Sequence, residues 1–239
     1  MPVAERTARP SFPERQTDAS PDEEDFSIPT WKRTLDVGAI TIFAPVWLTL
    51  MICISVWIRL ISPGPIFFTQ ERVGFRGRKF KILKFRSMQM NAETDSHEDH
   101  FARLVESNQP MTKLDAAGDR RLIFRGRLLR ATGLDELPQL LNVLRGDMSL
   151  VGPRPCTEPE LSSYQMEQLE RFDAWPGLTG HWQVNGKNNT TFNRMIELDV
   201  FYARHASLRL DLMILLKTIP ALLAQVRETR SGRLRQDND

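Results

Sequence analysis

The chain has 239 residues, 41% of them hydrophobic and 26% charged, and its formal net charge at pH 7 is +2. A chain of this length can bury one sizeable core, while a charge balance so close to zero excludes a general polyanion binder and predicts no nucleic-acid partner. The two cysteines, Cys53 and Cys156, provide neither a disulfide framework nor metal-ligand spacing.

Residues 1–27 combine proline, serine, threonine and charged side chains with almost no large apolar residue. Such a segment buries too little apolar surface to offset the entropy of ordering, so we predict a disordered N-terminal tail. It is not a signal peptide, because no apolar core follows a short basic start.

An apolar membrane segment follows at residues 28–62. Between Val37 and Ile58, 22 consecutive residues carry no charge, which is enough for a helix to cross a hydrocarbon core about 30 Å thick. Pro45 lies inside this run, where it removes a helical hydrogen bond, so a kink is predicted there. Basic residues of the kind found at a cytoplasmic face flank both ends. They are Lys32 and Arg33 before the run, and Arg59, Arg72, Arg76, Arg78, Lys79, Lys81, Lys84 and Arg86 after it.

Two arrangements of this segment agree with its residues. A re-entrant helix, which enters and leaves the membrane on one side, accounts for the basic residues at both ends. An ordinary spanning helix also tolerates a proline, and the physical signals alone favour neither arrangement. Trp31, Trp47 and Trp57 suit anchoring at the interface in both.

Residues 63–226 predict one helix-rich α+β domain, and residues 227–239 a polar C-terminal tail. Alternating stretches at 66–70 and 80–85 indicate strands joined by a basic turn, a surface that favours anionic lipid head groups or phosphates. Helices are expected at 121–133, 159–172, 192–204 and 208–226. The last is interrupted by Asp211, Lys217 and Pro220, so we expect it to lie amphipathically at the bilayer interface or in the core.

Two smaller features of this domain are an apolar stripe and a polar segment with two histidines. An apolar stripe along the helix expected at 121–133 consists of Leu122, Phe124, Leu128 and Leu129. Upstream, His97 and His100 bracket two acids, but their polar neighbourhood lacks the support of a preorganised metal site, so a solvated segment is expected.

Two adjacent carboxylates, Asp135 and Glu136, open the stretch DELPQLLNVLRGDMSLVGPRP. Because Gly133 ends one helix and Pro138 suits a first turn, Asp135 is expected near a helix N-terminus. For Asp135 alone, a helix cap is the simpler interpretation. Neighbouring helical residues point about 100° apart, however, so the pair can serve one site in different roles, such as nucleophile and metal ligand.

The same stretch ends on an arginine in a stiff turn. Arg154 lies between Pro153 and Pro155, and a guanidinium held in this way suits bidentate binding of a phosphate, although a surface turn with a solvated arginine explains it equally. Together with the apolar segment, these residues suggest phosphate chemistry at a bilayer.

Several motifs in this order resemble those of the bacterial sugar transferases. The motifs are KRTLDV, GPIFFTQERVG, FKILKFRSM, LDELPQLLNVLRGDMSLVGPRP, WPGLTGHWQVNGKNN and ELDVFYARHASLRLDLMILLKTI, and they cover about residues 31–224. This family comprises the monotopic polyprenyl-phosphate hexose-1-phosphate transferases, also called phosphoglycosyl transferases, here in a short form.

The resemblance implies a two-step reaction at the cytoplasmic face of a bacterial inner membrane. Asp135 would attack the sugar-bearing phosphorus of a UDP-sugar and release UMP, leaving a phosphosugar-aspartyl enzyme. Undecaprenyl phosphate, a polyprenyl phosphate, would then accept the sugar phosphate, which starts exopolysaccharide or other glycoconjugate synthesis. Glu136 would ligate Mg²⁺, Arg154 would hold a phosphate, and Lys84, Arg130 and Asp199 would line the site.

The family's membrane helix is re-entrant and broken at a Ser-Pro pair, which favours re-entry here as well. This chain has Ala44-Pro45 at that point, so the proline is present and the serine, which can bond a freed carbonyl, is absent. Gly133 likewise replaces a serine before the carboxylate pair.

Two other functions stay open at this point. A non-catalytic membrane adaptor would keep the fold without needing Asp135, Glu136 and Arg154, and a lipid-linked phosphate hydrolase would use water in the second step. The residues do not identify the sugar; glucose and galactose lead, and N-acetylated hexoses remain open. A homodimer is one arrangement that a flat membrane-associated domain allows.

Overall fold

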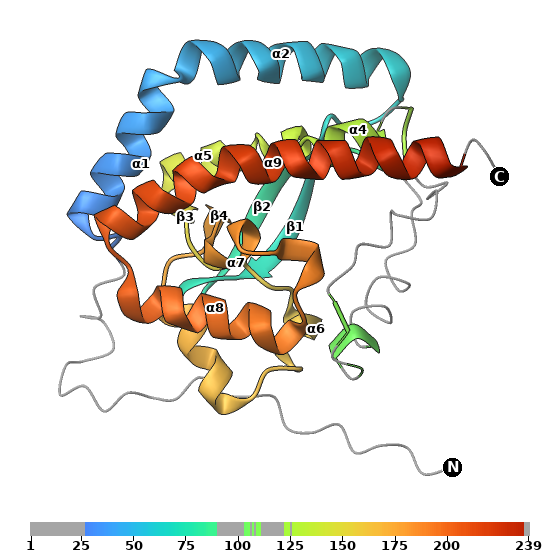
Figure 1. The fold of residues 1–239 in the computed structure, drawn as a ribbon. Coiled ribbons are helices and arrows are strands. Elements are labelled where there is room, and N and C mark those ends of the chain that lie inside the picture. Colours follow the sequence, from blue (N-terminus) through green and yellow to red (C-terminus); the bar gives the residue numbers. More distant parts are fainter. Residues whose placement is uncertain are drawn as a thin grey trace.

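The computed structural model describes residues 27–89, 103–105, 107, 109–110, 122–124 and 126–236. The predicted N-terminal tail, except Ser27, and the segment with His97 and His100 lie outside the described residues. A helix-rich α+β fold is confirmed, with an apolar helix and the long C-terminal helix along one side and two small sheets beneath them (Figure 1).

The apolar segment forms two helices with a sharp break between them. Helix α1 spans Thr30–Ile42 and α2 spans Ala44–Ile61, and Figure 1 shows them running in clearly different directions. The break falls at Phe43, so Pro45 lies in the first turn of α2, where its missing N–H is not needed. The predicted kink is therefore present, two residues before the proline.

A tryptophan satisfies a carbonyl at this break. The indole Nε1 of Trp47 donates to the carbonyl oxygen of Ile40 at 3.0 Å, and the Trp47 side chain is buried. In a continuous helix that carbonyl would accept from the backbone of Ala44. The indole therefore supplies a donor beside Ala44, where the family has a serine.

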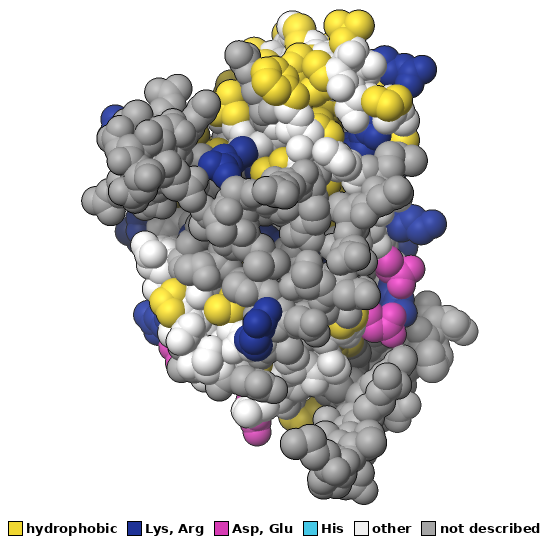
Figure 2. Space-filling model, turned by 90° about the vertical axis from the view of Figure 1, so that its right-hand side faces the viewer, with side chains coloured by type: hydrophobic (Ala, Val, Ile, Leu, Met, Phe, Trp, Pro, Cys, Tyr) yellow, Lys and Arg dark blue, Asp and Glu magenta, His cyan; other side chains and the backbone are white. Residues whose placement is uncertain are grey.

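Helix α2 presents most of its apolar side chains outward. Among the described residues, Ala44–Ile61 is the single helix whose length and composition would allow it to cross a membrane. Hydrophobic side chains gather at the upper end of the molecule, where α2 lies, with Lys and Arg side chains beside and below them (Figure 2). Such an exposed apolar band is consistent with membrane association.

Both ends of the apolar segment are bonded to the rest of the domain. At the α1 end, the buried Lys32 ammonium contacts Asp211 at 2.5 Å and donates to the Tyr202 hydroxyl at 2.8 Å. Asp36 accepts from the backbone N–H of Leu150 at 3.0 Å. At the α2 end, the Arg86 guanidinium donates to the carbonyls of Ser62 and Pro63, at 2.8 and 2.6 Å.

The predicted strands form an antiparallel hairpin. Strand β1 (Phe67–Val73) pairs with β2 (Lys79–Phe85) in the register Gln70 opposite Ile82, and the short helix η2 (Phe75–Gly77) makes the turn. Strands β3 (Ser149–Val151) and β4 (Gly177–Thr179) form a small parallel pair that the sequence did not predict.

Two of the expected C-terminal helices are confirmed. Helix α8 spans Phe192–His205, and α9 spans Leu208–Gln236, so it continues ten residues beyond the predicted end at 226. The short helices α7 (His181–Val184) and η6 (Lys187–Asn189) precede them. Leu212, Leu216 and Leu223 of α9 are exposed, while Ile214 is buried, as expected of an amphipathic helix.

Two other helix predictions are wrong in extent. The helix expected at 121–133 is limited to α4 (Gly126–Ala131); Leu122 instead forms an isolated β-bridge with Met88. Of the predicted stripe, Leu129 is 5% exposed, whereas Phe124 and Leu128 are 68% and 48% exposed. The helix expected at 159–172 is split into α6 (Glu158–Leu161) and the 3-10 helix η5 (Met166–Asp173).

Candidate active site

The two adjacent carboxylates lie in a 3-10 turn before a helix. Asp135 and Glu136 belong to η4 (Leu134–Glu136), whereas helix α5 begins later, at Gln139 (Gln139–Arg145). Its N-cap residue is Pro138, so the prediction that Asp135 caps the helix is wrong. Asp135 instead lies in the 3-10 turn that precedes α5, so its predicted place near a helix N-terminus is confirmed.

A left-handed glycine sets the entry to this turn. Gly133 has φ +71°, a backbone conformation that residues other than glycine rarely adopt. Its carbonyl accepts from the backbone N–H of Glu136 at 3.1 Å. The turn leaves Asp135 nearly buried, at 9% exposure, while the Glu136 side chain is about a third exposed. The two carboxylates therefore have different environments, as different roles require.

Lys84 of β2 contacts Glu136 directly. Its ammonium donates to Glu136 Oε1 at 2.8 Å, and both side chains are partly buried. Asn142 of α5 holds the strand in place, because its Oδ1 accepts from Leu83 N at 3.0 Å and its Nδ2 donates to the Lys81 carbonyl at 2.8 Å. Asn142 is fully buried, so this amide fixes β2 against α5 and thereby Lys84 against Glu136.

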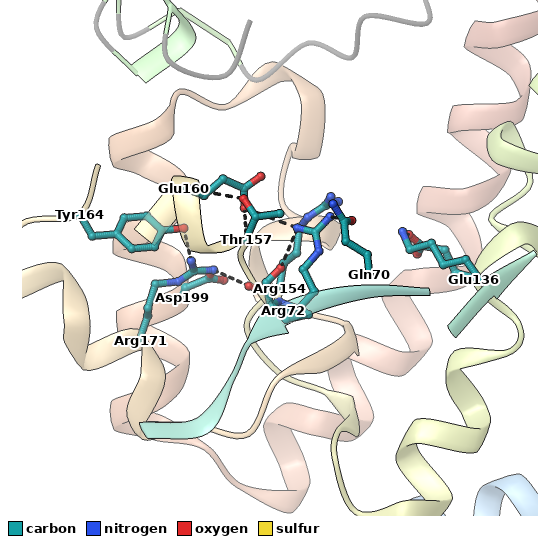
Figure 3. A network of polar contacts seen from close by, with 11 residues as sticks. Gln70, Arg72, Glu136, Arg154, Thr157, Glu160, Tyr164, Arg171 and Asp199 are labelled. Atoms are coloured by element: carbon teal, nitrogen blue, oxygen red, sulfur yellow. Dashed lines mark hydrogen bonds and ion pairs between the residues drawn. The ribbon is translucent and has the colours of Figure 1, made fainter. Parts of the chain in front are cut away.

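Arg154 follows β3, in the turn between that strand and α6. Figure 3 shows its side chain near Gln70 and Arg72 of β1, between the buried Asp199 and Glu136. Burial lowers the pKa of Arg72, and the positive charge of Arg154 lowers it further, while Glu160 opposes the shift. The charges of Arg154 and Glu136 both act on Arg72, so the two guanidinium groups add positive charge near Glu136.

Lys187, in η6, is a further cation that sequence reasoning missed. Burial lowers its pKa; the charges of Glu136 and Asp135 oppose this shift, and those of Arg154 and Lys84 add to it. Lys187 therefore lies within electrostatic reach of four predicted site residues: Glu136, Arg154, Asp135 and Lys84. Its backbone adopts φ +36°, and its ammonium donates to Gln225 Oε1 of α9 at 2.7 Å. Its place in NGKNN gave no signal, because nothing nearby in the sequence is charged.

The other two predicted site residues, Arg130 and Asp199, are bonded to Gln225 and Arg171, respectively. Arg130 lies in the last turn of α4, and its carbonyl accepts from Gln225 Nε2 at 3.4 Å, so Gln225 bridges Arg130 and Lys187. Asp199 of α8 is fully buried and forms an ion pair with Arg171 at 2.6 Å. Arg171 in turn donates to the Arg154 carbonyl at 2.8 Å, so Arg171 links Asp199 to the turn that carries Arg154.

Comparison with known proteins identifies the family. Residues 28–225 match the family model described as bacterial sugar transferase. The chain belongs to the bacterial sugar transferase family. The resemblance seen in the motifs is therefore confirmed, and the matched region includes the apolar segment and every candidate site residue.

Three relatives indicate the range of proteins to which this sugar transferase is similar. It is 37% identical over 195 residues to the exopolysaccharide production protein ExoY of Rhizobium meliloti, covering 80% of this chain and 84% of the relative. It is 42% identical over 193 residues to the UDP-galactose-lipid carrier transferase of Erwinia amylovora, covering 80% and 40%. It is 40% identical over 200 residues to the UDP-glucose:undecaprenyl-phosphate glucose-1-phosphate transferase of Caulobacter vibrioides, covering 80% and 69%.

The carboxylates of this sugar transferase fit the Mg²⁺ that the family resemblance implies. Among the described residues, no cluster of three or more His, Cys, Asp or Glu side chains forms an all-protein metal cage. Mg²⁺ does not need one, because it is commonly held by one or two carboxylates together with substrate phosphates and water. Asp135 and Glu136 supply such oxygen ligands, and the partial exposure of Glu136 leaves it accessible.

Proposed function

We propose that this sugar transferase moves a sugar 1-phosphate from a UDP-sugar to undecaprenyl phosphate and releases UMP, the step that initiates exopolysaccharide synthesis. The names of the relatives support this reaction and its substrates. The observation that carries the proposal is the arrangement around Asp135 and Glu136, where Lys84 bonds Glu136 and the charge of Lys187 interacts with both carboxylates.

Asp135 is the nucleophile in this proposal. One of its carboxylate oxygens forms a bond to the phosphorus that carries the sugar, while the bond from that phosphorus to the oxygen of UMP breaks. UMP leaves with the bonding electrons, and the sugar phosphate stays on Asp135. A phosphate oxygen of undecaprenyl phosphate then attacks the same phosphorus and restores the free carboxylate.

The cations around Asp135 stabilise the negative charge that this exchange concentrates. Preorganised cations in a water-poor site stabilise charge more strongly than in bulk solvent, because the local dielectric is low. Arg154 binds phosphate oxygens bidentately, and Lys84 and Lys187 supply point charges. Mg²⁺ held by Glu136 would neutralise charge on the diphosphate.

The two-step chemistry suits a site at a membrane boundary. One substrate is soluble and the other is a lipid, and a covalent intermediate lets them use the same site in turn. We propose that α1 and α2 form the re-entrant membrane helix and that the catalytic domain faces the cytoplasm of a bacterial inner membrane. The bonds from Lys32 and Arg86 support this, because they tie both ends of the apolar segment to one domain.

The test supplies purified protein with Mg²⁺, undecaprenyl phosphate and a panel of UDP-sugars, and measures UMP release. UMP and a lipid-linked sugar diphosphate are expected with at least one sugar, and the panel identifies that sugar. No release with any sugar would refute the enzymatic function and favour a membrane adaptor. Free sugar phosphate in place of the lipid product would favour a hydrolase.

A further inference from the structure

The turn that carries Arg154 is fixed through its carbonyl groups. Two of its residues are prolines and have no N–H, so the turn depends on donors from other elements. Three successive carbonyls accept from three such elements, β4, η5 and β1. The bonds are Gly177 N to Pro153 O at 2.9 Å, Arg171 Nη2 to Arg154 O at 2.8 Å, and Arg72 Nη1 to Pro155 O at 3.4 Å.

Arg171 makes the central contact from inside the protein. Its side chain and that of Asp199 are each 1% exposed. The same Nη2 that donates to the Arg154 carbonyl also donates to Asp199 Oδ2 at 2.6 Å, while Nη1 donates to the Tyr164 hydroxyl. A guanidinium is planar and donates in fixed directions, so Asp199 and Tyr164 set the direction from which Arg171 reaches the turn.

Stability alone gives a weak reason for this buried ion pair. Removing two charges from water costs about as much as their attraction returns, and apolar replacements of similar volume are often neutral or stabilising. Arg171 Nε is buried without a hydrogen-bond partner, which adds to the cost. What an apolar pair could not supply is the bond to the carbonyl of Arg154.

We infer that Arg171 and Asp199 are positioning residues that hold Arg154 in its phosphate-binding geometry without touching the substrate. This inference rests on the proposed function, because it assigns the pair to the same transfer reaction. It gives Asp199 a role that fits its complete burial: its carboxylate orients Arg171, and Arg171 orients the turn. The pair therefore affects the reaction only through the Arg154 side chain.

If Arg171 and Asp199 act only through the Arg154 side chain, they should affect activity more than stability. Displacing a binding group by about 1 Å can cost about 10²-fold in rate. The double variant Arg171→Met/Asp199→Leu should therefore lose about 10²-fold in kcat/KM for UMP release, with a thermal unfolding midpoint close to that of the unmodified protein. Arg154→Ala alone should lose at least as much.

The decisive variant combines all three substitutions. If the pair acts through Arg154, the triple variant should have the same kcat/KM as Arg154→Ala, because the pair then has nothing left to position. A matched control is Lys32→Met/Asp211→Leu, which removes another buried ion pair with no bond to the turn. When this control is combined with Arg154→Ala, the fold-changes in kcat/KM of the two sets of substitutions should multiply.

Two results would overturn the inference: activity losses that multiply in the triple variant, or unchanged kcat/KM in the double variant. If the double variant does not fold, Arg171→Lys enters the same cycle, since it keeps the charge and loses the planar fork. Failure of the proposed function is separate, because the unmodified protein would then release no UMP.

Discussion

The buried ion pair that anchors α1 offers a prediction whose size follows from the structure. Lys32→Met removes the ammonium that contacts Asp211 at 2.5 Å and leaves the Asp211 carboxylate, which has no exposed surface, with the Tyr202 hydroxyl as its donor at 2.6 Å. Breaking a buried pair on one side costs about 3–5 kcal/mol, because the remaining charge is uncompensated.

That cost converts to a measurable shift in thermal stability. For a domain of this size each kcal/mol lowers the unfolding midpoint by about 2–4 °C, so Lys32→Met should lower it by roughly 6–20 °C. The double variant Lys32→Met/Asp211→Leu should recover most of this loss, because Tyr202 keeps a bond to the Val151 carbonyl at 3.2 Å. Circular dichroism in lipid nanodiscs measures both midpoints.

Equal midpoints for the single and double variants would refute this reasoning. They would mean that the uncompensated charge on Asp211 does not dominate the loss. A single variant within about 2 °C of the unmodified protein would refute it as well, since it would show that the pair contributes little to the anchoring of α1.

Three further predictions concern other parts of the molecule. Lys187→Arg should move the alkaline limb of the pH profile of kcat/KM to higher pH, because burial lowers the pKa of Lys187 and arginine stays protonated. Gly152→Ala should destabilise the protein by about 1–3 kcal/mol in thermal unfolding, because its Cβ would lie 2.0 Å from the Trp175 carbonyl. A maleimide should leave Cys156 of the folded protein unlabelled, since burial raises the pKa of its thiol to about 12, and should label it after unfolding; intact mass counts the labels.

Each of these predictions has a control and a contradicting result. If the unmodified protein and Lys187→Arg have the same alkaline limb in the pH profile of kcat/KM, another group determines that limb. Gly38→Ala is the control for Gly152, because its Cβ meets nothing within 4 Å and should stabilise α1 by about 0.5–1 kcal/mol. Two labels per folded chain would contradict the burial of Cys156.

The sequence predicted the elements that have a local pattern, and it missed those that depend on packing against distant parts of the chain. The hairpin strands, α8, α9 and the break near Pro45 follow from alternation, helical periodicity and proline. The stripe at 121–133 was misleading because periodicity does not distinguish a side chain that faces a core from one, such as Phe124, that is exposed. The split of the helix at 159–172 had a local signal, a second capping box that pairs Gln165 with Gln168.

The candidate site shows the same division. Asp135, Glu136 and Arg154 stand out by residue type and spacing, whereas Lys84 was expected in the site only through the family resemblance. Asn142 reads as a polar position in a leucine-rich helix, and its two bonds to β2 appear only when the strand packs against it. Lys187 is separated from Glu136 by 50 intervening residues, so no local pattern connects them.

The most direct test of the central claim is the mass of the intact protein after incubation with the UDP-sugar that supports UMP release, in the absence of lipid acceptor. The account predicts a mass increase of one sugar phosphate, located on Asp135 by peptide mapping, which disappears when undecaprenyl phosphate is added. Asp135→Asn should show no increase. An unmodified protein that still transfers sugar phosphate, or full activity of Asp135→Asn, would contradict the covalent mechanism.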